Sequence, residues 1–242
     1  MRLSGSFFMP LLFLVVFGTG IGSSVIGGMG QGDLDYVTFL YPGIVAMVVL
    51  TNSVMASMSI VWDREFGFLK EVLVAPISRT AVAIGKALGG ATLASCLGMV
   101  MLVFIPFAHV KPSAAGVFMM IGVMFVLALS LASLGLYVAS RIRSMEAFGV
   151  VMQLLMFPLM FLSTTLFPAD RLPSWLGTLI KFNPFTYGVD AMRQAILGSD
   201  VAAPYGIELF GYQMPIILDV VVVALFGLVM GILAVRSFHV QD

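Results

Sequence analysis

The chain has 242 residues, of which 60% are hydrophobic and only 10% are charged, and its formal net charge is zero. A mean hydropathy of +1.10 leaves too little polar surface to cover a soluble globule of this size. The composition therefore predicts an integral membrane protein in contact with lipid. The zero net charge gives no electrostatic reason to expect a nucleic-acid partner.

Apolar runs long enough to cross a membrane occur six times along the chain. A helix needs about 20 residues to cross ~30 Å of hydrocarbon. The runs lack the alternation of period two that is typical of a membrane barrel, so we expect helices. We predict one all-α membrane domain, residues 1–242, with six transmembrane helices at about 7–27, 38–62, 86–108, 114–139, 147–167 and 214–235.

Arginine and lysine are unevenly distributed between the two sides that these six spans define. One side carries eight of them: Arg2, Arg64, Lys70, Arg79, Lys86, Arg141, Arg143 and Arg236. The other side carries Lys111, Arg171, Lys181 and Arg193. Because cytoplasmic loops are enriched in basic residues, both termini are predicted to be cytoplasmic in a multi-pass protein of the plasma (inner) membrane. No A-x-A cleavage site follows the first apolar run, so we expect this run to be retained as a helix.

The segment Trp62–Lys86, which we call the charged island, lies between the second and third spans. Its charged residues are Asp63, Arg64, Glu65, Lys70, Glu71, Arg79 and Lys86. Trp62, Phe66, Leu69 and Leu73 recur at helical spacing and predict an amphipathic helix that Pro76 ends, while Ser78 can cap the helix that follows. Such a helix either anchors the loop to the membrane or presents a docking surface to a cytosolic partner.

A second amphipathic helix is predicted in the long loop before the last span. Asn183 followed by Pro184 is typical of a helix start and Gly198 of a helix end, so we predict a helix over 184–197. Its apolar face carries Phe185, Val189, Met192 and Ile196, and its other face carries Asp190, Arg193 and Gln194. The helix either lies on the outer leaflet or re-enters the membrane to close the outer end of a translocation path. Residues 175–182 are expected to form another short element.

Polar residues are rare inside the predicted spans. Asn52, Ser53 and Ser57 form an arc on the second span, and Gln153 marks the fifth. These residues either form hydrogen bonds between helices or line a substrate path. Asp219, near the outer end of the sixth span, is expected to reach the aqueous interface. So few ionisable groups argue against an ion-coupled transporter.

The sequence contains no motif that binds ATP or a metal ion. It lacks G-x-x-x-x-G-K-[ST], H-E-x-x-H and paired Cys-x-x-Cys motifs, and it has one cysteine, Cys96. We therefore expect that this chain is not an enzyme and holds no cofactor.

Three segments resemble those of type-2 ABC transporter permeases, the membrane subunits related to daunorubicin-resistance and nodulation-factor exporters. The run DREFGFLKEVLVAPISRTAVAIGK, residues 63–86, resembles the segment between the second and third spans of that family. The matching residues are Asp63, Arg64, Glu65, Gly67, Leu69, Leu73, Pro76, Ser78, Arg79, Gly85 and Lys86. YPGI at 41–44 and NPFTYGVDAMRQAILG at 183–198 resemble two further family segments in the same order.

This resemblance implies the permease of an ATP-driven exporter of drugs, lipids or glycolipids, of the kind associated with drug resistance. Two copies of a separate P-loop ATPase would bind the ATP and Mg²⁺, and the permease would form a homodimer. The resemblance implies an ATPase-docking coupling helix containing Asp63, Arg64, Glu65, Phe66, Gly67, Leu69, Leu73 and Pro76. It also implies an outer re-entrant helix containing Asn183, Pro184, Asp190 and Arg193. The alternative is a transporter or channel that needs no ATPase.

Overall fold

Long apolar helices dominate the computed structural model, which describes residues 12, 15–16, 35–66, 78–108, 110–169, 173–209 and 212–239. Four of its helical segments are long and apolar enough to cross a membrane. They are α3 (Tyr36–Glu65), α5 (Arg79–Met101) with its 3₁₀ continuation η2 (Leu102–Ala108), α6 (Ala114–Arg141) and α11 (Ile216–His239). A shorter apolar helix, α7, covers Met145–Phe161. The predicted first span falls outside the described residues except at three positions, so six spans stay a prediction.

Helix α6 contacts α3, α5, α7 and α11, and α3, which contacts α5, α6 and α7, is the most deeply buried of the long helices. Two thirds of the most apolar stretch of α3 is buried (67%), against 17% for α11. Small residues allow the close approach: a Cβ atom added at Gly90 of α5 would lie 2.9 Å from the Ala56 Cβ atom of α3. The Ser57 hydroxyl of α3 donates a hydrogen bond to the Ala132 carbonyl of α6 at 3.1 Å. At Ser57, therefore, the polar arc on α3 joins two helices.

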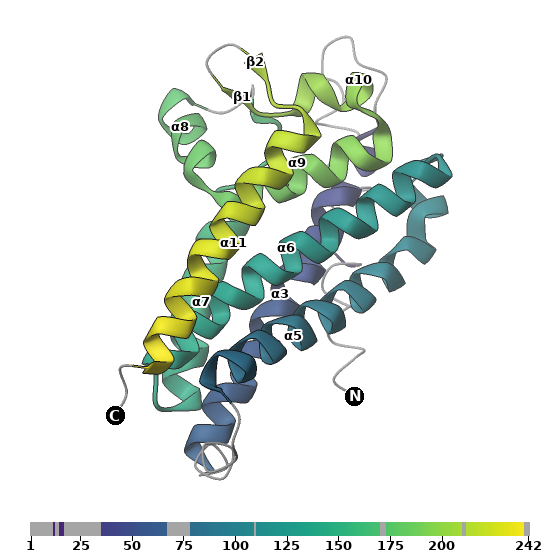
Figure 1. The fold of residues 1–242 in the computed structure, drawn as a ribbon. Helices are drawn as coiled ribbons and strands as arrows, with labels where there is room; N and C mark the ends of the chain where they lie inside the picture. The colour runs from purple at the N-terminus through teal and green to yellow at the C-terminus, as the bar shows by residue number, and fades with distance from the viewer. Residues whose placement is uncertain are drawn as a thin grey trace.

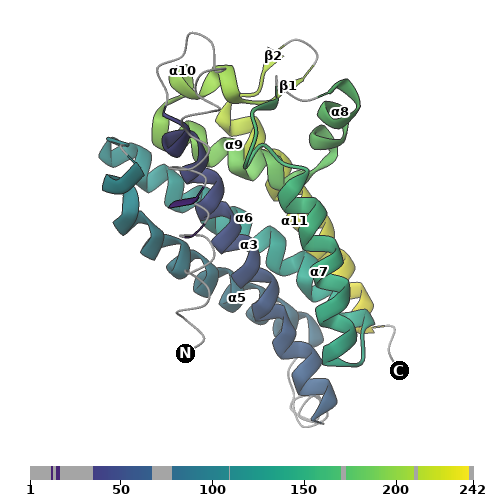
Figure 2. The same cartoon turned by 180° about the vertical axis from the view of Figure 1, so that it is seen from behind.

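Short elements gather at one end of the bundle, which we call the α9 end (Figures 1 and 2). They are α8 (Ser174–Phe182), α9 (Pro184–Leu197), α10 (Ser199–Ala202), η4 (Ala203–Tyr205) and an antiparallel hairpin of β1 (Glu208–Leu209) and β2 (Tyr212–Gln213). The predicted helix over 184–197 is confirmed at both ends. The Asn183 side chain accepts a hydrogen bond from the Phe185 amide, and Gly198 adopts a φ of 89°, which favours glycine.

The opposite end of the bundle is the island end. There α3 finishes, α5 begins, and residues 142–144 connect α6 to α7. Ser78 caps α5 by accepting a hydrogen bond from the Ala81 amide at 3.2 Å, as predicted. The island residues 67–77 lie outside the described residues, so their predicted amphipathic helix stays a prediction.

The fifth apolar helix is shorter than the sequence predicts. The prediction placed the span at 147–167, but α7 ends at Phe161. At ~1.5 Å per residue its 17 residues extend ~26 Å, less than the ~30 Å of hydrocarbon. Pro158 lies in its last turn, and the following residues, Ser163, Thr164 and Thr165, are buried in a turn. The helix can end here because side chains of the α9 segment bind the carbonyl groups that it leaves free.

Candidate functional site

Helix α9 is buried on both its apolar and its polar face. Asp190 and Arg193 have no exposed surface, and Gln194 is only 7% exposed. The helix packs against α3, α6, α7 and α11. Such burial does not fit a helix that lies on the outer leaflet with its polar face in water. Its polar face is directed into the protein because matching polar groups are available there.

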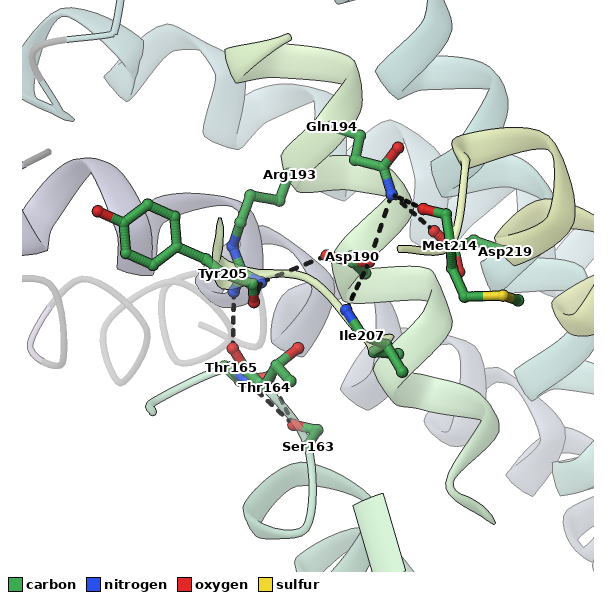
Figure 3. A network of polar contacts seen from close by, with 10 residues as sticks. All are labelled: Ser163, Thr164, Thr165, Asp190, Arg193, Gln194, Tyr205, Ile207, Met214 and Asp219. Atoms are coloured by element: carbon green, nitrogen blue, oxygen red, sulfur yellow. Dashed lines mark hydrogen bonds and ion pairs between the residues drawn. The ribbon is translucent and has the colours of Figure 1, made fainter. Parts of the chain in front are cut away.

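Arg193 joins three parts of the α9 end (Figure 3). Its Nη2 atom donates a hydrogen bond to the Thr164 carbonyl at 2.6 Å, in the turn after α7. Its Nη1 atom lies 3.5 Å from the Tyr205 carbonyl and 3.6 Å from Asp190 Oδ1. The guanidinium also lies over the Phe39 ring, 4.2 Å from its centroid. One cation thus holds α9 against α3, η4 and the end of α7.

Gln194 connects α9 to α11 in the same cluster. Its Nε2 atom donates hydrogen bonds to Asp219 Oδ2 and to the Met214 carbonyl, both at 2.9 Å, and to Asp190 Oδ2 at 3.3 Å. Asp190 Oδ2 also accepts a hydrogen bond from the Ile207 amide at 3.3 Å. We call Asp190, Arg193, Gln194 and Asp219 the polar cluster.

Asp219 lies inside the protein, not at the aqueous interface as the sequence predicted. It has no exposed surface. The prediction was wrong because α9 covers the first turn of α11 and supplies the Gln194 amide as a partner. A carboxylate can be buried only where other polar groups compensate for the lost water.

The polar cluster brings two acids and one base together inside the protein, where none of the three has exposed surface. Arg193 Nε and Asp219 Oδ1 have no hydrogen-bond partner among the described residues. Buried polar groups left without partners are costly, so separating α9 from α11 requires that water enter.

Asn183 joins α9 to α7. Its Oδ1 atom caps α9, and its Nδ2 atom donates hydrogen bonds to the carbonyls of Leu159 at 2.8 Å and Leu162 at 2.5 Å. These carbonyls belong to the last turn and C-cap of α7. The residue predicted to begin the helix therefore also connects two helices, and the following Pro184 occupies the first position of α9.

The predicted substrate-path residues do not lie together. Asn52, Ser53 and Ser57 are buried on α3, whereas Gln153 is exposed on α7. The Asn52 side chain donates to the Val48 carbonyl of its own helix at 2.8 Å. A path along these residues stays a prediction.

The structure describes the first four residues of the predicted coupling helix. The three charged ones have contacts within the chain, and the aromatic one is exposed. Asp63 forms an ion pair with Lys86, while Arg64 and Glu65 form hydrogen bonds with residues at the junction of α6 and α7. Phe66 is 70% exposed. The charged side chains are thus engaged within the chain, and the aromatic one is available at the surface.

These features define a multi-pass helical membrane protein whose buried polar groups join helices. Among the described residues, no group of three or more His, Cys, Asp or Glu could hold a metal ion.

Comparison with known proteins gives the family. Residues 2–197 match the ABC-2 type transporter family, and this chain belongs to that family of membrane transport subunits. It is 29% identical to ycf38 of Cyanophora paradoxa, named as a transport permease, over 76% of this chain and 64% of the relative. It is 28% identical to YbhR of Escherichia coli (strain K12), named as a multidrug ABC transporter permease, over 68% of this chain and 45% of the relative. Nodulation protein J of Rhizobium leguminosarum bv. viciae is 26% identical over 80% of this chain and 74% of its own length. The chain thus spans less than two thirds of the first two relatives.

Proposed function

We propose that this protein is the permease subunit of an ATP-driven exporter in the inner membrane, with both termini in the cytoplasm. Family membership supports transport, and the name of YbhR, a multidrug permease, supports drugs as a cargo class. Lipids and glycolipids are the further cargo classes that the family resemblance implies. The observation that carries the proposal is the shortness and complete burial of α9. This helix is too short to span the membrane, and it is buried on all faces at one end of an apolar bundle.

In this proposal α9 is a re-entrant helix that closes the outer end of the translocation path. Its 14 residues extend only ~21 Å. The polar cluster and Asn183 hold it against α7 and α11. Opening the path therefore requires that the Gln194–Asp219 and Arg193–Thr164 contacts separate and become hydrated.

The driving force enters at the island end. Two ATPase subunits would bind a homodimer of this chain through the charged island, with Phe66, Leu69 and Leu73 as its apolar contact face. ATP-driven closure of the ATPases would then move the island and, through the long helices, the α9 end. An apolar bundle suits a hydrophobic or amphipathic cargo.

A binding assay tests this proposal. The purified permease is incubated with each ABC-class ATPase of the same genome that lacks a membrane domain. We expect one of them to bind, and we expect Phe66→Asp combined with Leu69→Asp to weaken that binding at least tenfold. Phe182→Asp is the matched control, because Phe182 is equally an exposed aromatic residue (81%) but lies on α8 at the other end. The proposal is wrong if no ATPase binds and transport instead follows an ion gradient without ATP.

A further inference from the structure

Three consecutive charged residues at the end of α3 each contact a different helix. Asp63 forms an ion pair with Lys86 of α5. The next residue, Arg64, reaches the end of α6, and the next, Glu65, reaches the start of α7. Successive residues of a helix point about 100° apart, so this run covers about 200° of the α3 circumference.

Arg64 and Glu65 each carry a charge opposite to the partial charge of the helix end that they contact. Arg64 Nη1 donates hydrogen bonds to the carbonyls of Ser140 at 3.1 Å and Ile142 at 3.0 Å, where α6 ends. The last carbonyls of a helix have no partners within it and carry partial negative charge, so a cation is favoured there.

Glu65 meets the opposite pole. Its Oε2 atom accepts a hydrogen bond at 3.1 Å from the amide of Met145, which is the first residue of α7. An anion is favoured at a helix N-terminus. Because only residues 142–144 separate α6 from α7, a C-terminus and an N-terminus lie side by side, and a basic residue followed by an acidic one fits both.

We propose that Asp63, Arg64 and Glu65 are positioning residues that clamp α5, α6 and α7 to the end of α3, so that movement of the charged island is transmitted to these helices and not absorbed by the loop. This inference rests on the proposed function. It assigns the docking contact to the apolar residues beginning at Phe66, and it gives the three charged residues an internal role.

Of the three residues, Arg64 is expected to contribute most to holding the helices together. The Asp63–Lys86 pair is partly exposed, with side-chain exposures of 31% and 25%, and pairs of this kind contribute little because solvent screens them. Arg64 is partly buried and binds two carbonyls with charge-assisted hydrogen bonds, which are stronger. Beyond it, Arg141 Nε donates to the Ser237 hydroxyl at 3.3 Å and extends the connection from α6 to α11.

The test separates ATPase binding from transmission. A single reporter cysteine, Ser163→Cys in a Cys96→Ala background, is placed in the turn after α7, where Ser163 is 2% exposed. The permease–ATPase complex is reconstituted in liposomes, and labelling by a membrane-impermeant maleimide is measured with and without ATP. For Arg64→Gln we expect ATPase binding within twofold of wild type and an ATP-dependent labelling rate at least fivefold lower. Arg64→Lys should restore part of the labelling, and Glu146→Gln, an exposed acid in the first turn of α7, should leave it unchanged.

A charge exchange gives the second arm and controls for folding. Asp63→Lys alone and Lys86→Asp alone place like charges side by side, so each should lower the ATP-dependent labelling, by less than Arg64→Gln does, and the double exchange should restore it to within twofold. The inference is overturned if Arg64→Gln labels like wild type, if the exchange gives no recovery, or if these variants lose ATPase binding in proportion to labelling, since that would make them docking residues. Failure of the unmodified permease to bind any ATPase would instead refute the proposed function.

Discussion

Gln194 of α9 and Asp219 of α11 form a 2.9 Å hydrogen bond inside the protein, 25 residues apart in the sequence. The same Nε2 atom also donates to the Met214 carbonyl and to Asp190. One side-chain amide therefore holds the short α9 against the last long helix.

Removing this amide should destabilise the α9 end. In Gln194→Leu, Asp219 and the Met214 carbonyl lose a buried donor, at a cost of about 1–3 kcal/mol for each group left without a partner. We expect a clearly lower unfolding temperature in detergent, measured by tryptophan fluorescence or by aggregation on heating. Gln213→Leu, an exposed glutamine of β2, is the control and should change the temperature little. Equal stability of the two variants would show that the amide contributes nothing.

Replacing Arg193 alone should lower the stability of the protein more than replacing Arg193 and Asp190 together. Arg193→Met leaves Asp190 buried without its cation, which typically costs about 3–5 kcal/mol. For a chain of this size such a loss lowers the unfolding temperature by about 10 °C. The double variant Arg193→Met plus Asp190→Leu should recover at least half of this loss, because no unpaired charge remains. Additive effects in this double-mutant cycle would contradict the direct ion pair.

Asn183 should depend on its nitrogen as well as its oxygen. Asn183→Asp keeps the acceptor that caps α9 but loses the donor to the Leu159 and Leu162 carbonyls, and it places a carboxylate beside them. We expect Asn183→Asp to be at least as destabilising as Asn183→Ala, by about 1–3 kcal/mol. If the residue were only an N-cap, aspartate would replace it without loss. Thermal unfolding of the three proteins side by side distinguishes these outcomes.

Two neighbouring glycines of α5 should respond differently to the same substitution. Gly90 packs against Ala56 of α3, whereas a Cβ atom at Gly89 would meet no atom within 4 Å. Gly90→Val should therefore overpack the α3–α5 contact and destabilise the protein by about 1–3 kcal/mol relative to Gly89→Val. Both variants change helix propensity equally, so the difference in unfolding temperature reports packing alone. A similar temperature for both would contradict the described α3–α5 interface.

Local chemistry made α9 predictable from the sequence. Asn183, Pro184 and Gly198 are start and stop signals that act on their immediate neighbours, and both helix ends fall where they predict. The same is true of Ser78 at the start of α5. Elements whose ends are set within a few residues of chain need no tertiary information.

Long-range contacts explain what the sequence did not reveal. Helix α7 stops at Phe161 although no charged residue follows before Asp170, because Asn183 and Arg193 supply donors to the carbonyls beyond it. The burial of Asp219 likewise depends on Gln194, which the sequence placed only on the polar face of another helix. The signal in the sequence for this contact was Asp219 in an apolar span, together with the polar face of the helix over 184–197, which needed partners.

The central claim is that ATP, bound by a separate subunit, opens the α9 end of this permease. The most direct measurement is the ATP dependence of maleimide labelling at Ser163→Cys in the reconstituted complex, compared between the wild-type ATPase and one whose P-loop lysine is replaced by alanine. The account predicts slow labelling without ATP, because Ser163 is buried, and at least fivefold faster labelling with ATP and the wild-type ATPase only. Labelling that ignores ATP, or that follows an imposed ion gradient instead, would contradict it.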